Sequence, residues 1–186
     1  MKKSAGMIGA GISAAVIISV IVMFAMNQNA PQTGNLEPGK QETAKLNVVA
    51  SFYPLYQFSK GVGGDRADVS TLVPSGIEPH DWEPSPGDLI SLKNANVFVY
   101  NGVGMEPFVD KLIASEEYKG TVFVESTKGI GLIKITEKNE ERFVNNPHVW
   151  LDPILAKQQV DAIRDAFAKA DPDNAAYYEQ NANDYN

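Results

Sequence analysis

From residue 46 onward, short apolar runs alternate with longer stretches in which apolar residues recur every three or four positions. The short runs predict buried strands and the longer stretches predict amphipathic helices. Strands are expected at 46–51, 69–73, 97–100 and 121–124, and helices at 55–62, 88–94, 106–115, 154–170 and from 172 onward. Strands that take turns with helices indicate an α/β lobe with a parallel sheet and right-handed crossovers.

Three of the expected helices have a recognisable start, in which a small polar residue precedes a proline. Ser85, Asp152 and Asp171 each stand directly before proline. Such residues accept hydrogen bonds from the first free backbone N–H groups of a helix, and proline suits the first helical position. We therefore expect these three residues to be N-caps, although Asp152 also lies near enough to His148 to bond there instead.

The N-terminal part of the chain is different in character. Lys2 and Lys3 precede an uncharged apolar run from Ile8 to Met26, which is nearly long enough to span a membrane. Flanking lysines favour a cytoplasmic N-terminus, so the rest of the chain is expected outside the cytoplasm. The alternative is a cleaved signal segment, which would leave a secreted or periplasmic protein. The expected segments are an anchor at 1–26, a polar linker at 27–45, an α/β lobe at 46–153 and helices at 154–186.

Charge and cysteine content exclude several functions. The 186 residues include 23 acidic and 16 basic ones, giving a net charge of −7, and there is no basic run. Nucleic acid is therefore excluded as an expected partner. The absence of cysteine rules out disulfides, thiolate metal sites, cysteine nucleophiles and a lipid attached to cysteine.

The only two histidines, His80 and His148, each occupy a Pro-His-x-Trp tetrapeptide that contains one of the two tryptophans, Trp82 or Trp150. Both follow predicted strands through loops, which places them at the carboxyl edge of the sheet, where α/β proteins bind ligands. Neutral imidazole nitrogen is a common zinc ligand. Because the two residues are far apart in sequence, only the fold could pair them, and hydrogen-bonded loop histidines remain the alternative.

The loop around His80 has two features that suit a preorganised ligand. Residues 74–86 contain four prolines, which restrict the loop before any ligand binds. Glu78, Asp81 and Glu83 surround the histidine and are candidates for outer-shell acceptors, for ligands or simply for solvated charges. The rings of residues 52–54 and of Trp82 are candidate pocket walls, with core packing as the alternative.

Four ordered motifs strongly resemble the zinc/manganese substrate-binding proteins of ABC transporters. These are LVPSGIEPHDWEPSP at 72–86, NGVGMEPF at 101–108, NPHVWLDP at 146–153 and DPDNAAYY at 171–178. The resemblance extends over residues 46–186. It implies a binding protein rather than an enzyme, with Zn²⁺ or alternatively Mn²⁺ as its ligand, His80 and His148 as metal ligands, and an ABC transporter permease as partner.

The resemblance also implies a fold of two lobes joined by a long helix, with the metal between them. The expected fold class is therefore α/β: a single Rossmann-like lobe with a parallel sheet, the start of the inter-lobe helix, and no C-terminal lobe. The chain is accordingly expected to be a fragment with half a site. Residues 133–146 lack the histidines with which many relatives gather metal. An adhesin or interaction module of the same fold is an alternative, whereas a metal-dependent hydrolase is disfavoured because no H-E-x-x-H or G-x-S-x-G motif is present.

Overall fold

The computed structural model of this chain describes residues 44–135 and 145–186. The expected anchor at 1–26 and nearly all of the linker at 27–45 lie outside the described residues, so both remain predictions. Among the described helices, none combines the length and the apolar character that a membrane span requires. Residues Thr43–Asn186 form one compact unit.

The unit is built on four parallel strands in the order β2-β1-β3-β4. The strands are β1 (Leu46–Ala50), β2 (Ala67–Thr71), β3 (Val97–Tyr100) and β4 (Val122–Glu125). Val48 of the central strand β1 lies opposite Val69 on one side and Val97 on the other. The predicted α/β class and parallel sheet are confirmed.

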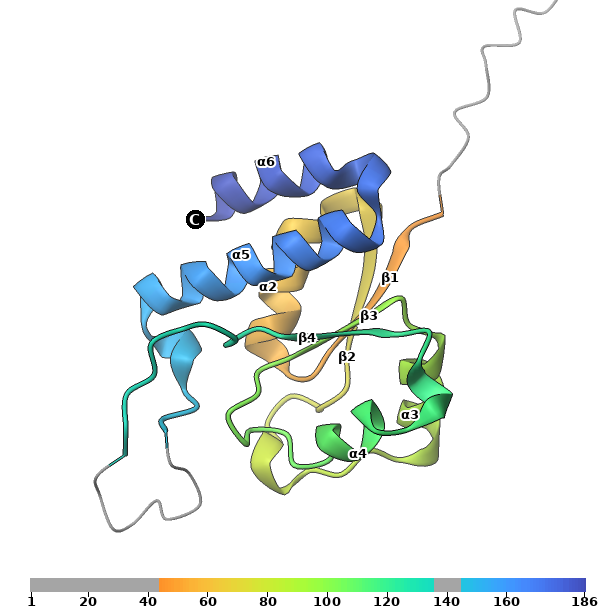
Figure 1. Cartoon of the computed structure of the whole chain (residues 1–186), viewed down its shortest axis with the longest axis vertical. Helices are drawn as coiled ribbons and strands as arrows, with labels where there is room; N and C mark the ends of the chain where they lie inside the picture. Colours follow the sequence, from red (N-terminus) through yellow and green to blue (C-terminus); the bar gives the residue numbers. More distant parts are fainter. Residues whose placement is uncertain (1–43, 136–144) are drawn as a thin grey trace, which may run out of the picture. The chain divides into compact units, whose positions relative to one another are not determined.

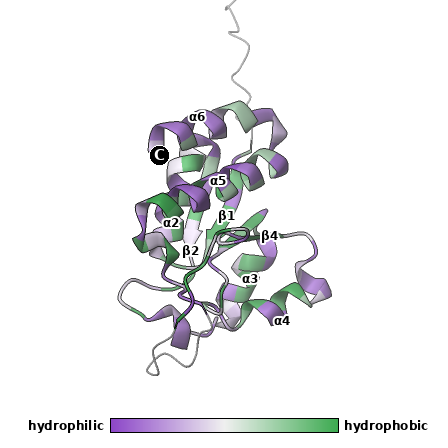
Figure 2. Ribbon diagram, turned by 60° about the vertical axis from the view of Figure 1, so that its left-hand side comes forward, coloured by the Kyte–Doolittle hydropathy of each residue, from purple (hydrophilic) through white to green (hydrophobic). Residues whose placement is uncertain are grey.

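Two helices cover one face of the sheet, and a third helix packs against both of them (Figure 1). They are α2 (Tyr53–Gly63), α5 (Pro153–Ala170) and α6 (Ala175–Tyr185). Ile163, Phe167 and Tyr178 from this layer are completely buried with Val48 and Val97 of the sheet. Hydrophobic and hydrophilic residues alternate along α5 and α6, as expected of helices that cover a core on one side (Figure 2). Both helices after residue 153 thus contribute to the core of the lobe.

The opposite face of the sheet is covered by α3 (Pro86–Asn94), α4 (Val109–Ile113) and the 3₁₀ turn η3 (Glu116–Tyr118). Val49 and Phe98 point to this side, because successive strand residues face opposite ways. They pack with Leu92 and Leu112 in a second buried cluster. The sheet is therefore buried on both faces. The loops that form the site follow the carboxyl ends of its strands.

Two of the three expected N-caps are confirmed and one is wrong. Ser85 forms a capping box with Asp88, and Asp152 accepts hydrogen bonds from the backbone N–H groups of Ile154 and Leu155. Asp171, however, makes no capping bond. Its carboxylate accepts hydrogen bonds from the Tyr178 hydroxyl at 2.6 Å and the Asn174 amide at 2.8 Å, which ties the start of α6 to the end of α5. A 3₁₀ turn, η6 (Pro172–Asn174), precedes α6.

Candidate metal-binding site

The fold brings the two histidines together at the carboxyl edge of the sheet. His80 lies in the 3₁₀ turn η2 (Pro79–Asp81), which follows β2, and His148 immediately precedes η5 (Val149–Leu151). Their ring centroids are 5.9 Å apart and the ring planes are inclined by 78°. Two imidazoles on a tetrahedral zinc ion, with Zn–N bonds of about 2.0–2.1 Å, would place their centroids about 5 Å apart. The observed separation is close to that distance.

The hydrogen bonds of His148 define which ring nitrogen is available. The Asn146 side-chain Oδ1 accepts a hydrogen bond from the His148 backbone N–H at 3.0 Å and lies 2.9 Å from Nδ1 of the ring. A backbone N–H can only donate, so the shared asparagine atom must be the oxygen. Nδ1 therefore carries the ring proton, and Nε2 keeps the lone pair that a metal ion needs. Asn146 thus orients the His148 ring by the kind of hydrogen bond that commonly orients histidines at metal sites.

His80 has different surroundings. Its side chain is only 10% exposed, although the preceding residues Ser75, Gly76 and Ile77 are all exposed. Its Nε2 lies 3.5 Å from Oε1 of Glu78, which is longer than an ordinary hydrogen bond. The Glu78 side chain itself is 63% exposed.

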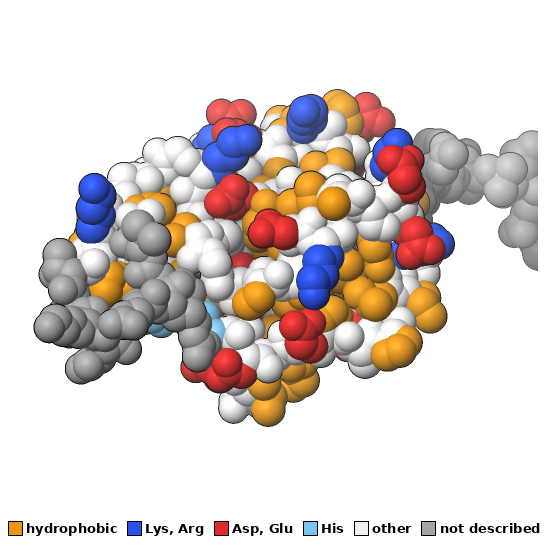
Figure 3. Space-filling model, turned by 60° about the horizontal axis from the view of Figure 1, so that its bottom comes forward, with side chains coloured by type: hydrophobic (Ala, Val, Ile, Leu, Met, Phe, Trp, Pro, Cys, Tyr) orange, Lys and Arg blue, Asp and Glu red, His pale blue; other side chains and the backbone are white. Residues whose placement is uncertain are grey.

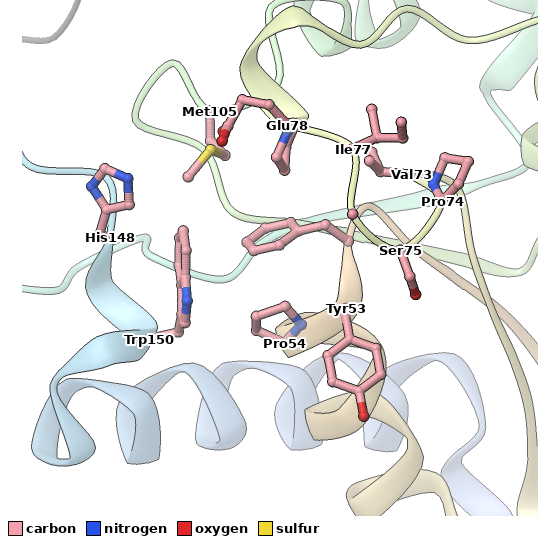
Figure 4. A pocket seen from close by; sticks show the side chains of 13 residues that line it. Tyr53, Pro54, Val73, Pro74, Ser75, Ile77, Glu78, Met105, His148 and Trp150 are labelled. Atoms are coloured by element: carbon pink, nitrogen blue, oxygen red, sulfur yellow. The ribbon is translucent and has the colours of Figure 1, made fainter.

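A pocket of about 260 Å³ opens beside His148, and the residues before His80, but not His80 itself, contribute to its lining. Figure 4 shows His148 and Trp150 next to each other, with Tyr53 and Pro54 from the start of α2 and with Met105 and Glu78 around the same space. The Trp150 ring lies 5.4 Å from the His148 ring and 4.7 Å from the Phe52 ring, measured between centroids. The aromatic wall expected at residues 52–54 is therefore present.

Trp82 does not play the same part as Trp150, despite the matching tetrapeptides. Its ring packs edge-on against Phe108, with centroids 5.6 Å apart, and contacts both buried clusters instead of lining this pocket. Of the two tryptophans, only Trp150 is a pocket wall. For Trp82 the alternative interpretation, core packing, is the one that the structure shows.

A second, more apolar pocket of about 370 Å³ lies on the other side of His148. Leu132, Ile133, Leu151 and Leu155 contribute to its lining, and Leu151 and Ile133 are strongly exposed. In the surface view, histidine atoms form a small patch with acidic side chains nearby (Figure 3). His148 thus lies on the boundary between two hollows of the surface.

Within residues 44–135 and 145–186, no group of three or more histidine, aspartate or glutamate side chains is arranged to hold a metal ion. The two imidazoles would supply two of the four ligands of a tetrahedral zinc site. Any further metal ligands would be water molecules or groups outside these residues.

A buried carboxylate next to the site was not predicted from the sequence. Glu106 is 5% exposed and accepts hydrogen bonds from the Ser51 hydroxyl and from the backbone N–H groups of Asn101 and Gly102. Its pKa is raised from 4.5 to about 7, chiefly by burial and to a smaller extent by the nearby Glu125, while the three hydrogen-bond donors act in the opposite direction. The expected helix at 106–115 is accordingly shorter, because Glu106 turns inward and α4 begins only at Val109. The signal that could have revealed it is the preceding Asn-Gly-x-Gly turn, which presents backbone N–H groups at the end of a strand.

Comparison with known proteins identifies the lobe. A family model described as "Zinc-uptake complex component A periplasmic" matches residues 48–186. The chain belongs to this ZnuA family. Binding proteins of the ZnuA family are non-enzymatic transport components, which confirms the expectation of a non-enzymatic protein. The resemblance noted from the four motifs is also confirmed.

Individual relatives include both zinc and manganese proteins. The high-affinity zinc uptake system protein ZnuA of Bacillus subtilis is 38% identical, over 91% of this chain and 55% of the relative. The manganese-binding lipoprotein MntA of Halalkalibacterium halodurans is 34% identical, over 91% of this chain and 53% of the relative. The crystal structure of Zn(II)-bound AdcA from Streptococcus pneumoniae shares 37% identity with a TM-score of 0.69, over 76% of this chain and 30% of that one. The chain thus spans about half the length of ZnuA and MntA.

Proposed function

We propose that this chain captures a divalent metal ion outside the cytoplasm for an ABC uptake system, with His80 and His148 as metal ligands. The observation that carries the proposal is the 5.9 Å approach of the two imidazoles, one of which has its Nε2 available. The names of its relatives support metal uptake, and the N-terminal segment at 1–26, with its apolar run from Ile8 to Met26, would hold the lobe at the membrane. The bound ion would then pass to a permease.

Zinc is the metal that we propose for this site, with manganese as the alternative. Two imidazole ligands suit zinc better than manganese, which prefers carboxylate and carbonyl oxygen. The relatives bind either metal, so family membership does not decide between them. The remaining ligands would come from a second lobe, which corresponds to the part of the relatives that this chain does not match.

The test is a zinc titration of the full chain, kept in mild detergent because of its apolar N-terminal run. Competition with a chromophoric chelator should give a measurable affinity, and His80→Ala or His148→Ala should each weaken it at least about tenfold, because loss even of an outer-shell partner typically costs 10–100-fold. Glu116→Ala serves as a control that removes an exposed acidic side chain away from the histidines. Normal zinc binding by the double histidine variant would contradict the proposal.

Two further arms separate the alternatives. Metal binding to imidazole competes with protons, so zinc affinity should be clearly weaker at pH 5.5 than at pH 7.5. Equal affinity at both values would point to carboxylate ligands. Manganese titrated under the same conditions should bind much more weakly than zinc, and the opposite order would assign the site to manganese. No observation on the described residues favours the adhesin alternative.

A further inference from the structure

Beneath the histidines lies a set of buried polar residues that apolar packing alone does not require. They are all at most 5% exposed, and they come from the ends of β1, β3 and β4 and from α5. We call them the buried polar network: Ser51, Asn101, Glu106, Ser126, Thr127 and Gln159. Burying polar groups is tolerated only where they bond to one another, so a network of this size usually fixes one geometry.

Glu106 holds one end of the network. Its Oε1 accepts from the Ser51 hydroxyl at 2.6 Å and from the Asn101 N–H at 2.9 Å, and its Oε2 accepts from the Gly102 N–H at 3.0 Å. These bonds close the turn after β3, in which Val103 adopts a φ of 58° between two glycines that also have positive φ. A β-branched residue in that region is strained, and such strain persists only where surrounding contacts maintain it.

Asn101 links this turn to the histidine segment. Its side-chain Nδ2 donates to the Pro147 carbonyl at 2.9 Å, and its Oδ1 accepts from the Gln159 amide at 3.0 Å. Its backbone carbonyl accepts from the Thr127 hydroxyl at 2.6 Å. Every polar group of Asn101 is therefore engaged, and one of its bonds fixes the peptide that immediately precedes His148.

The chemistry of the network indicates a demand for geometry beyond stability. Glu106 is a buried carboxyl whose partners are neutral donors, an arrangement that is expensive compared with apolar packing. Gln159 has a buried side-chain oxygen with no hydrogen-bond partner among the described residues, which is a further cost. Both unfavourable burials occur in the network that binds the Pro147 carbonyl, next to the Pro147–His148 peptide.

We propose that Glu106 and Asn101 are positioning residues that hold the Pro147–His148 peptide so that the His148 ring meets the His80 ring in a metal-binding arrangement. This inference rests on the proposed metal-capture function. Neither residue touches the metal. They act through the Pro147 carbonyl, and Asn146 then sets the rotation of the ring.

The experiment compares two network variants of the full chain with one control. Asn101→Asp keeps the shape but places an oxygen against the Pro147 carbonyl, so zinc affinity should fall at least tenfold. Gln159→Met removes the donor to both Asn101 and Ser126 together with the unsatisfied oxygen, so it should lower the melting temperature and also weaken zinc binding severalfold. Thr121→Val breaks an equally buried hydrogen bond, to the Leu92 carbonyl at the other end of β4, and should lower the melting temperature while zinc affinity stays within twofold.

A spectroscopic readout keeps this test independent of the proposed function. In a long-range ¹H–¹⁵N spectrum of the metal-free chain, the His148 ring should show the Nδ1–H tautomer in the wild type and in Thr121→Val. Asn101→Asp and Gln159→Met should shift or broaden that signal. If the wild type fails to bind zinc but the network variants still disturb the His148 signal, the metal function fails and the positioning role stands. Unchanged zinc affinity and an unchanged His148 signal in both network variants would overturn the positioning role.

Discussion

The two histidine segments differ in what holds them. His148 follows the buried Pro147, whose carbonyl is bonded to the network, and its ring is bonded to Asn146. His80 follows an exposed, proline-rich loop, and its own side chain is nevertheless nearly buried. One histidine is thus positioned by tertiary hydrogen bonds and the other by the limited freedom of its loop. Metal affinity should therefore fall either when the tertiary hydrogen bonds of the His148 segment are removed or when the His80 loop becomes more flexible. Each of these changes can be made separately.

The largest effects are expected from the two tryptophans. Trp82→Ala and Trp150→Ala should each lower the free energy of unfolding by about 3 kcal/mol, because each removes a large ring from an aromatic contact. Only Trp150 contacts the His148 ring, so Trp150→Ala should also weaken zinc binding about tenfold, whereas Trp82→Ala should change it less than about threefold. Urea unfolding and chelator competition on both variants measure the two quantities. Equal losses of zinc affinity would mean that the matching tetrapeptides function alike.

The network should also make stability depend on pH. The native pKa of Glu106 is raised from 4.5 to about 7, chiefly by burial, so between these values the folded state binds more protons than the unfolded state. The stabilisation that the raised pKa of Glu106 adds to the free energy of unfolding is therefore fully present below pH 4.5. It is lost as the pH rises to 7, by up to about 3 kcal/mol. The difference in unfolding free energy between wild type and Glu106→Gln should shift by that amount across this window. A constant difference would show that Glu106 is ionised throughout.

The structural features that the sequence predicts correctly are those that depend only on residues close together in the chain. The strand at 97–100 is predicted to the residue, and Ser85 and Asp152 cap their helices as expected, because apolar runs and polar-proline starts act locally. Asp171 fails as a cap because it bonds to Tyr178, seven residues away. Local patterns do not report such bonds.

The candidate site shows the same division. The meeting of His80 and His148 follows from their placement after parallel strands, as the sequence predicts. The role of Glu106 does not follow, because its partners are backbone N–H groups and a hydroxyl from another strand end. Nor does the difference between Trp82 and Trp150, since their similar Pro-His-x-Trp tetrapeptides enter different surroundings. The segment held by tertiary bonds is thus the less predictable of the two.

A glycine pair tests how firmly the turn beside His148 must be held. Gly102 and Gly129 have nearly equal φ values of 84° and 86°, so alanine should cost about 1–2 kcal/mol at either position. A Cβ at Gly102 would also collide with the Glu125 side chain, whereas a Cβ at Gly129 would meet nothing within 4 Å. Gly102→Ala should therefore destabilise the fold by about 1 kcal/mol more than Gly129→Ala and also weaken zinc binding. If the two variants unfold at the same urea concentration, Glu125 moves aside freely.

The smallest effect is expected in the His80 loop, from a matched pair of prolines. Pro79 and Pro172 both begin 3₁₀ turns, but only Pro79 adjoins a histidine. Replacing either with alanine should lower the unfolding free energy by about 0.4–1 kcal/mol, because the unfolded chain gains freedom. Pro79→Ala should in addition weaken zinc binding by about two- to fivefold, since the loop must then be ordered when the metal binds. Chelator competition resolves a difference of that size, with Pro172→Ala expected to match the wild type. If Pro79→Ala also binds zinc like the wild type, the burial of the His80 ring, rather than the stiffness of its loop, positions this ligand.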